Sequence, residues 1–303
     1  MQAAQVSEYG DASKILVQEA ATPIAREGQV LVTVVAASVN PFDLTLASGA
    51  MAGMIPLTLP YTIGGDFAGT MDDGRQVYGT ALVANGGSGS MAEQTVANMK
   101  NISDKPKSIG FEEAASLPLA GCSALQAIEE HLDLQKGQKI LIHGGAGGIG
   151  TLAIQLAKLR GGYVATTASA VDRDMLTGLG ADLVIDYKAE DFTTLISEYD
   201  AVFDTVGGEV TNQSLQVLKT GGKLVTMIGE PDLKRAEELG IVVTRQNTGV
   251  TTERLERIAL HIERGELKPV IDKVFPLEKS RDAYEYFVSG HPKGKVVLRI
   301  NTN

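Results

Sequence analysis

The sequence has a single cysteine, Cys122, no tryptophan and four histidines among 303 residues. One cysteine cannot form an intramolecular disulfide, and these few residues cannot build a four-cysteine zinc site. No apolar run reaches the roughly eighteen residues that cross a membrane, and the amino terminus lacks the basic start and apolar stretch of a secretion signal. We therefore expect a soluble, cytoplasmic protein.

Positive charge is also scarce. The chain has 27 Lys and Arg against 37 Asp and Glu, a net charge of -10. This sign disfavours binding to nucleic acid or to an anionic membrane surface. Any phosphate binding must then be local, and we expect the partner to be a small molecule.

The chain has two parts with different sequence patterns. The first part contains short β-rich runs, such as VLVTVVAASV, that are interrupted by Gly, Pro and Asn. From Gly137 onward strand-like and helix-like runs alternate, which predicts an α/β fold with a doubly wound parallel sheet. The stretch TTERLERIALHIERGE predicts an amphipathic helix that ends at Gly265. The six expected strands lie at 138–143, 163–168, 183–187, 201–206, 223–228 and 241–246.

A glycine-rich loop follows the first of these strands and precedes an apolar helix. Gly145, Gly147 and Gly150 match the G-x-G-x-x-G spacing, with Gly148 and Ile149 between them. Glycines at this spacing permit a tight turn, a close approach of the backbone to a diphosphate, and close packing of helix on strand. The order strand, loop and helix predicts a dinucleotide site in which these five residues contact the cofactor.

The end of the second strand discriminates between NAD and NADP. Enzymes that use NAD place an acid there for the ribose 2′-hydroxyl, but no Asp or Glu occurs between residues 151 and 171. Thr167 and Ser169 offer hydroxyls instead, with Arg173 and Tyr187 nearby in the expected fold. This pattern favours NADPH, because a guanidinium and hydroxyls accept a 2′-phosphate. For Arg173 an exposed helix position remains an equal alternative.

Several ordered motifs resemble the zinc-free quinone oxidoreductase branch, similar to ζ-crystallin, of the medium-chain dehydrogenase/reductase superfamily. The resemblance covers nearly the whole chain. Its motifs are Asn40-Pro41-Phe42-Asp43, Gly65-Asp66-Phe67-Ala68-Gly69, FEEAASLPLAGCSALQAI at 111–128, DTVGG at 204–208 and SGHPKGKVVL at 289–298.

The resemblance implies a fold and a reaction. It implies a GroES-like, β-rich catalytic domain from 1–112 and 267–303, with a Rossmann NADP-binding domain at 113–266 between the two parts. It also implies the absence of zinc, because Asn40 and Gly65-Asp66 stand where metal-dependent relatives have a Cys and a His–Glu pair. The expected reaction is hydride transfer from NADPH to a quinone or an α,β-unsaturated carbonyl. A homodimer is a further family expectation.

The resemblance also implies roles for individual residues, and alternatives remain open for some of them. Asn40 and Asp43 would line the catalytic cleft, or form an Asx turn before a helix. Tyr61 would donate a proton, or pack as a strand-start aromatic. Lys295 would anchor a cofactor phosphate, or face solvent. The residues expected beside the nicotinamide are Ser123, Val206, Ile228 and Gly229.

Two departures from the family pattern leave other functions open. Thr45 and Met51 stand where some quinone reductases have tyrosines, so a tyrosine acid at those positions is excluded. This motivates the alternative of a non-catalytic NADPH-binding sensor or partner protein. A zinc-dependent alcohol dehydrogenase is a weaker alternative. His143 and Cys122 are interpreted as buried structural residues.

Overall fold

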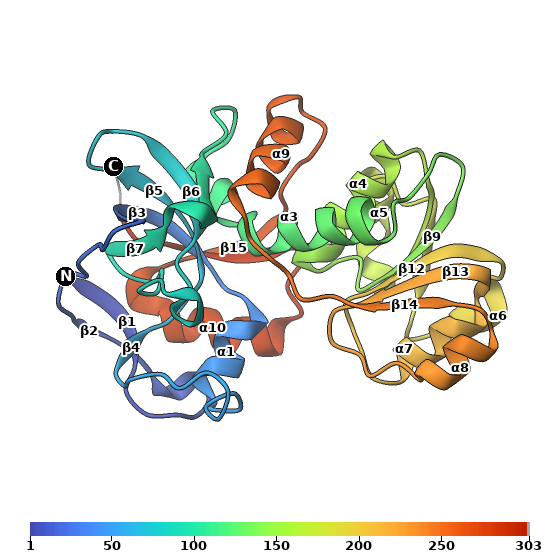
Figure 1. The fold of residues 1–303 in the computed structure, drawn as a ribbon, viewed down its shortest axis with the longest axis horizontal. Helices are drawn as coiled ribbons and strands as arrows, with labels where there is room; N and C mark the ends of the chain where they lie inside the picture. The colour runs from blue at the N-terminus through green and yellow to red at the C-terminus, as the bar shows by residue number, and fades with distance from the viewer. Residues whose placement is uncertain (302–303) are drawn as a thin grey trace. The chain divides into compact units, whose positions relative to one another are not determined.

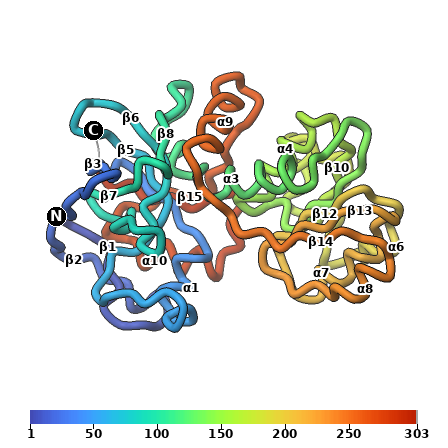
Figure 2. The backbone as a smooth tube through the Cα atoms, in the orientation of Figure 1, coloured from blue at the N-terminus to red at the C-terminus, as the bar shows by residue number. Residues whose placement is uncertain are grey.

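The computed structural model describes residues 1–301, so the last two residues of the expected segment 267–303 lie outside it. The chain forms two compact units. Unit 1 contains Met1–Cys122, Val250–Gly265 and the residues from Pro269 onward, and unit 2 contains Ser123–Gly249 and Glu266–Lys268. Figure 2 shows that segments from both ends of the chain lie side by side in unit 1.

Unit 2 is built on one six-stranded parallel sheet in the order β11-β10-β9-β12-β13-β14. Reading the strands in chain order gives 3-2-1-4-5-6, the order of a dinucleotide-binding sheet. All six expected strands are confirmed. They are β9 (Lys139–His143), β10 (Tyr163–Ala168), β11 (Leu183–Asp186), β12 (Tyr199–Asp204), β13 (Leu218–Thr226) and β14 (Val242–Arg245).

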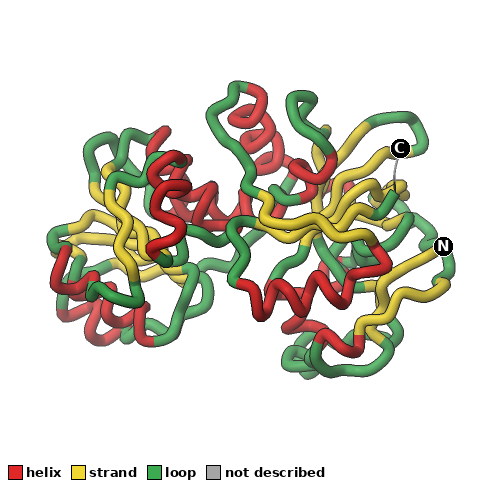
Figure 3. The backbone as a smooth tube through the Cα atoms, turned by 180° about the vertical axis from the view of Figure 1, so that it is seen from behind, coloured by secondary structure: helices red, strands yellow, loops and turns green. Residues whose placement is uncertain are grey.

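Helices cover both faces of this sheet, as Figures 1 and 3 show. Phe192 of α6 and Ala236 of α8 share an apolar cluster with the strand residues Leu141, Ala165 and Val202. Helix α4 packs on β9 and β10 from the other face (Figure 1). The doubly wound fold is therefore confirmed. The helices of unit 2 are α4 (Gly148–Leu159), α5 (Arg173–Gly178), α6 (Phe192–Leu195), α7 (Glu209–Gln213) and α8 (Leu233–Glu238), with the π-helix η4 (Gln126–His131) and the 3-10 helices η5 (Ala170–Asp172) and η6 (Ser214–Gln216).

Unit 1 is β-rich, as the sequence predicts. Its larger sheet has the order β15-β16-β3-β5-β6-β8, with β7 also paired to β3, and its smaller sheet has the order β2-β1-β4. The strands are β1 (Gln2–Val6), β2 (Ile15–Glu19), β3 (Gln29–Ser38), β4 (Tyr61–Thr62), β5 (Asp66–Met71), β6 (Gln76–Thr80), β7 (Gln94–Asn98), β8 (Ile102–Asp104), β15 (Ile271–Pro276) and β16 (Lys295–Arg299).

The core of unit 1 joins the two ends of the chain. Val6 of β1 packs in one cluster with Tyr284 of α10 and with Val296 and Leu298 of β16. The tail therefore packs with the first part of the chain in unit 1. The helices of this unit are α1 (Pro41–Ala47), α2 (Phe111–Ala115), most of α3 (Pro118–Leu125), α9 (Thr252–Glu263) and α10 (Ser280–Gly290), with the turns η1 (Ala12–Lys14), η2 (Val83–Asn85), η3 (Met99–Asn101) and η7 (Leu277–Lys279). Within residues 1–301, no helix has the length and apolar character needed to span a bilayer.

The compact units divide the chain at residues other than the expected 112 and 266. Helix α9 has the predicted buried stripe, with Leu255, Ile258 and Ile262 buried. However, α9 packs within unit 1. The Tyr78 hydroxyl donates to the Leu255 carbonyl at 2.5 Å, and the Thr252 hydroxyl donates to the Ile102 carbonyl at 2.8 Å. Amphipathic spacing shows that one face is buried but not which sheet covers it.

Candidate cofactor and active site

The glycine loop has the geometry of a dinucleotide site. Strand β9 ends at His143, and Gly147 is the N-cap of the twelve-residue helix α4. A Cβ on Gly150 would lie 2.2 Å from the Gly144 carbonyl oxygen, and a Cβ on Gly145 would lie 2.0 Å from Thr166 Oγ1. Only glycine fits at these two positions, because strand, loop and helix are in direct contact there.

Gly147 differs from Gly145 and Gly150 because the space that a Cβ would occupy is open. A Cβ there would meet a single atom within 4 Å, the Gly144 carbonyl oxygen at 3.4 Å. Its φ of -76° and ψ of 170° are allowed for any residue. The structure of the protein alone therefore does not require glycine at this position. A diphosphate that approaches the amino end of α4 does, so the loop fits this group.

The end of β10 presents a serine and no acid. Tyr187 N donates to the Ala168 carbonyl at 3.3 Å, which places Tyr187 beside the strand end that Ser169 follows. Tyr187 is about half exposed. Arg173 begins α5 and lies 3.9 Å from Glu190. Ser169, Arg173 and Tyr187 therefore lie near the carboxyl ends of β10 and β11, and their contact with a 2′-phosphate stays a prediction.

The structure does not support Thr167 as a ligand of the 2′-phosphate. Its side chain is buried, and its hydroxyl lies 3.0 Å from His143 Nδ1 and 3.4 Å from the Gly144 amide. The reason is the register of β10 and β9, which pairs Thr167 with His143 and places both side chains on the same face of the sheet. Thr167 instead holds His143 at the start of the glycine loop.

His143 is buried and bonded through both ring nitrogens, because Nε2 lies 3.0 Å from Ser214 Oγ. Burial lowers its pKa from 6.5 to about 4, while the charge of Asp204 acts in the opposite direction. The unfolded chain therefore binds more protons than the folded one between these two values. Stability contributed by neutral His143 is complete above about pH 6.5 and is lost as the pH falls toward 4.

We predict that the free energy of unfolding of unit 2 rises by about 3 kcal/mol between pH 4 and pH 6.5 because of His143. His143→Gln, which stays neutral, should remove most of this rise, whereas the exposed His291→Gln should retain it. Urea unfolding at a series of pH values measures the effect. Parallel pH profiles for wild type and His143→Gln would contradict the assignment.

Asp204 organises the loop after β12, and its role was not assigned from the sequence. This fully buried carboxylate accepts hydrogen bonds at 2.9 Å from the amides of Val206 and Gly207. It also accepts bonds from the hydroxyls of Thr211, at 2.6 Å, and Thr226, at 3.2 Å. The available signal was an acid at the carboxyl end of a buried parallel strand, inside the DTVGG motif.

Apolar side chains are exposed beside this loop. Val206 is 51% exposed and Ile228 is 66% exposed. Gly229 donates from its amide to the Thr226 hydroxyl at 2.9 Å, and a Cβ on it would lie 2.0 Å from Thr211 Oγ1. These two exposed apolar residues, one on the loop after β12 and one on the loop after β13, provide a surface on which a flat ring can lie. Their contact with the nicotinamide stays a prediction.

Ser123 is fully buried near the end of α3. Its hydroxyl lies 2.8 Å from Thr248 Oγ1, and its carbonyl accepts from Gln246 Nε2 at 3.0 Å. The structure shows these contacts within unit 2, and the expected place of Ser123 near the nicotinamide stays a prediction.

Unit 1 contains a buried polar cluster around Asn40. Lys295 Nζ donates to Asn40 Oδ1 at 2.5 Å and to the Val39 carbonyl at 2.7 Å. Asn40 Nδ2 donates to Asp66 Oδ2 at 3.0 Å, and this oxygen also accepts from the Leu119 amide at 3.0 Å. A cation and an acid therefore fix the orientation of the Asn40 amide from opposite ends.

Lys295 does not face solvent in this structure, since it is 7% exposed. Burial lowers the pKa of its ammonium and raises the pKa of the Asp66 carboxyl, while the two opposite charges act against these shifts. Of the two interpretations from the sequence, the exposed one is wrong, because the ammonium is bonded inside unit 1. Its contact with a cofactor phosphate stays a prediction.

Asp43 joins the same region to helix α10. Its Oδ2 accepts hydrogen bonds from the backbone amide of Asn40 and from the Tyr284 hydroxyl, each at 2.9 Å. Burial is the main cause that raises its pKa to about 7. The bond to Asn40 caps α1, which agrees with the turn interpretation of the motif. The catalytic role of Asp43 stays a prediction.

Tyr61 is part of the unit 1 core and is 7% exposed. Its hydroxyl is buried without a hydrogen-bond partner among the described residues. Burial, with Asp43 as a second cause, raises its pKa above the ordinary value. These observations favour the packed-aromatic interpretation over the proton donor.

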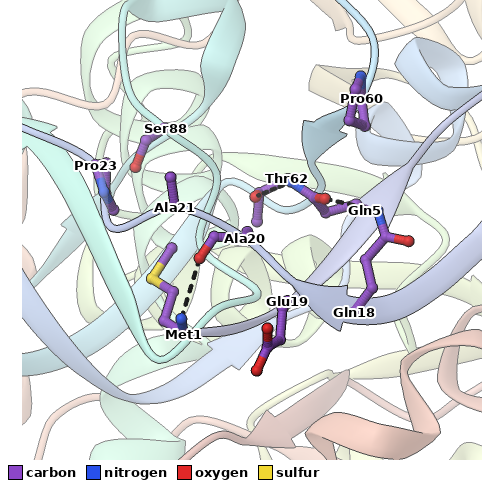
Figure 4. Close-up of a pocket in the computed structure, with 10 residues that line it drawn as sticks. All are labelled: Met1, Gln5, Gln18, Glu19, Ala20, Ala21, Pro23, Pro60, Thr62 and Ser88. Atoms are coloured by element: carbon purple, nitrogen blue, oxygen red, sulfur yellow. Dashed lines mark hydrogen bonds between the residues drawn. The ribbon is translucent and has the colours of Figure 1, made fainter.

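Unit 1 also has a cavity of about 390 Å³, which Pro60 and Thr62 line on either side of Tyr61 in the chain (Figure 4). It is lined by the side chains of Gln5, Gln18 and Thr62 and by the chain around Ala20. Gln18 Nε2 donates to Gln5 Oε1 at 2.8 Å. None of the predicted catalytic or cofactor residues lines it. We therefore do not include this cavity in the candidate site.

Within the described part of the chain, no group of three or more His, Cys, Asp or Glu side chains is placed to hold a metal ion. The side-chain amide of Asn40, the residue expected in place of a zinc ligand, is bonded to Lys295 and Asp66. Cys122 is buried in α3. Zinc independence remains a proposal.

A glycine loop on a sheet of this order, joined to a GroES-like unit, defines the class of two-domain oxidoreductases that includes the alcohol dehydrogenases. Comparison with known proteins agrees. Residues 26–107 match the alcohol dehydrogenase GroES-like domain, and residues 179–298 match a family described as zinc-binding dehydrogenase.

Individual relatives cover almost the whole chain. The 2-methylene-furan-3-one reductase of Solanum lycopersicum is 36% identical, and the chloroplastic NADPH-dependent alkenal/one oxidoreductase of Arabidopsis thaliana is 35% identical. Each alignment covers 98% of this chain and 79% of the relative. The solved quinone oxidoreductase of Coxiella burnetii superposes with a TM-score of 0.91 and 33% identity over 99% of both chains. The chain belongs to the medium-chain dehydrogenase/reductase superfamily.

Proposed function

We propose that this protein is an NADPH-dependent, zinc-independent reductase that transfers a hydride to a quinone or an α,β-unsaturated carbonyl. The observation that carries the proposal is the open side of Gly147 at the amino end of α4, which the protein's own packing does not explain. The relatives named above as alkenal/one, furanone and quinone reductases support the choice of acceptor.

The residues of unit 2 would hold the cofactor. Backbone N–H groups at Gly147 and the first turn of α4 bind the diphosphate, aided by the helix dipole. Ser169, Arg173 and Tyr187 bind the 2′-phosphate, and the exposed faces of Val206 and Ile228 contact the nicotinamide. When bound, NADPH supplies a hydride to the β-carbon of an enone or to a quinone, and the acceptor takes up a proton.

In unit 1 we assign the polar contact with the acceptor to Asn40. One Nδ2 hydrogen is bonded to Asp66, which leaves the second for an acceptor oxygen. The bond from Lys295 to Oδ1 polarises the amide and strengthens that donor. Asp43 acts as a positioning residue, because its carboxyl is bonded to the backbone amide of Asn40.

The test is NADPH consumption with 1,4-benzoquinone, phenanthrenequinone and a series of 2-alkenals. We expect turnover with at least one of them, unchanged after dialysis against a chelator. Bound NADPH without turnover on any acceptor would favour the non-catalytic sensor instead. Activity that is lost on chelation and restored by zinc would favour the metal-dependent alternative.

We also propose that the protein works in the cytoplasm as a homodimer, without a nucleic-acid or membrane partner. The net charge of -10 and the single buried Cys122 support this. Strand β14 is an edge of the unit 2 sheet, and its Val242 is 56% exposed, which would suit edge pairing between two copies. Sedimentation at several concentrations tests the dimer.

A further inference from the structure

A fixed carboxylate lies beside the expected 2′-phosphate site. Glu190 Oε2 accepts from the Asp186 amide at 2.8 Å, and the Glu190 amide donates to the Asp186 carbonyl at 2.8 Å. The side chain is therefore tied to the turn that follows β11. Asp186 pairs with Ala168, the last residue of β10. The turn therefore lies next to Ser169, which follows Ala168 in the chain.

The same carboxylate oxygen lies 3.9 Å from Arg173 Nη2. Both side chains are partly exposed, 48% for Arg173 and 41% for Glu190. The exposed pair itself adds little to stability. Its consequence concerns binding, because the guanidinium expected to receive the 2′-phosphate already has an anionic neighbour.

We infer that Glu190 is a specificity-determining residue that limits the preference of this protein for NADPH over NADH by competing with the 2′-phosphate for Arg173. The inference rests on the proposed NADPH site and deepens it. A 2′-phosphate is close to a dianion at neutral pH, and it has to displace the Glu190 carboxylate from the Arg173 guanidinium before it can pair with that group. NADH has a hydroxyl at this position and does not compete for the guanidinium.

Glu190→Gln tests the inference with little effect on the fold, because the amide oxygen of Gln can still accept from the Asp186 amide. We expect this variant to bind NADPH and 2′,5′-ADP about fivefold more tightly at low ionic strength. The affinities for NADH and 5′-ADP should stay within about twofold. Fluorescence titration and calorimetry measure the four affinities without any turnover.

Asp174→Asn is the matched control, since it removes one exposed carboxylate from the same helix as Arg173. It should leave the preference between NADPH and NADH unchanged. In a protein that already carries Arg173→Gln, the gain in NADPH affinity from Glu190→Gln should be smaller. The reason is that no guanidinium is present for which the carboxylate and the phosphate could compete.

Two results would overturn the inference about Glu190 and leave the proposed function standing. One is an unchanged NADPH affinity in Glu190→Gln while wild type binds NADPH, and the other is an equal gain with and without Arg173. If wild type binds neither NADPH nor 2′,5′-ADP, the proposed function fails together with the inference. If NADPH binds but no acceptor is reduced, the chemistry fails while the role of Glu190 can still be measured.

Discussion

Gly147→Ala should weaken NADPH binding by about 30-fold or more while the protein remains folded. The added Cβ would contact only the Gly144 carbonyl, at 3.4 Å, and the backbone angles suit alanine. The methyl group therefore occupies space that only a ligand needs. We expect the melting temperature without cofactor to fall by no more than about 3 °C, because alanine is a poorer N-cap than glycine.

Two further variants make this prediction specific. Gly147→Ser restores a good N-cap, so it should match wild type in stability and still bind NADPH poorly. Gly178→Ala adds a methyl group at the end of α5, where no atom lies within 4 Å, and should leave NADPH affinity within about twofold. Wild-type affinity in both Gly147 variants would mean that the loop does not hold a diphosphate.

Lys295→Met should destabilise unit 1 by about 3 kcal/mol. The change removes the donor to Val39 O and Asn40 Oδ1 and leaves the buried Asp66 without its cation. Burial of an unpaired charge is among the costliest changes in a protein interior. Urea unfolding without cofactor measures the loss, and hydrogen exchange in peptides from β3 and β16 localises it to unit 1.

A double variant tests whether charge is the cause. Lys295→Met with Asp66→Asn removes both charges and should recover a large part of the stability lost in the single variant. The exposed Lys279→Met, which removes only a surface pair with Asp282, should change stability by less than about 1 kcal/mol. If the double variant loses more free energy of unfolding than the two single variants lose together, the cluster is not held by opposite charges.

The sequence was most informative where side chains are buried on both sides. Near-continuous apolar runs such as Lys139–His143 and Tyr199–Asp204 occur when helices cover both faces of a parallel sheet, and all six strands formed as predicted. The glycine spacing was equally informative, because Gly145 and Gly150 are fixed by direct steric contact. Both features depend on neighbours that are close in the chain.

Features that depend on distant neighbours were not predictable. Lys295 is bonded to Asn40, 255 residues away, and nothing in a local pattern indicates that a lysine is buried. The burial of α9 was evident from Leu255 and Ile258, but its partner in unit 1 was not. For Thr167, its position near the strand end was predicted correctly, while the direction of its hydroxyl toward His143 depends on the register of β9 and β10.

The most direct test of the account is a crystal structure of the protein with NADPH. We expect the diphosphate within hydrogen-bonding distance of backbone N–H groups between Gly147 and Gly150, and the 2′-phosphate beside Ser169 and Arg173. Density for the dinucleotide at any other place, with the amino end of α4 left free, would contradict the central claim.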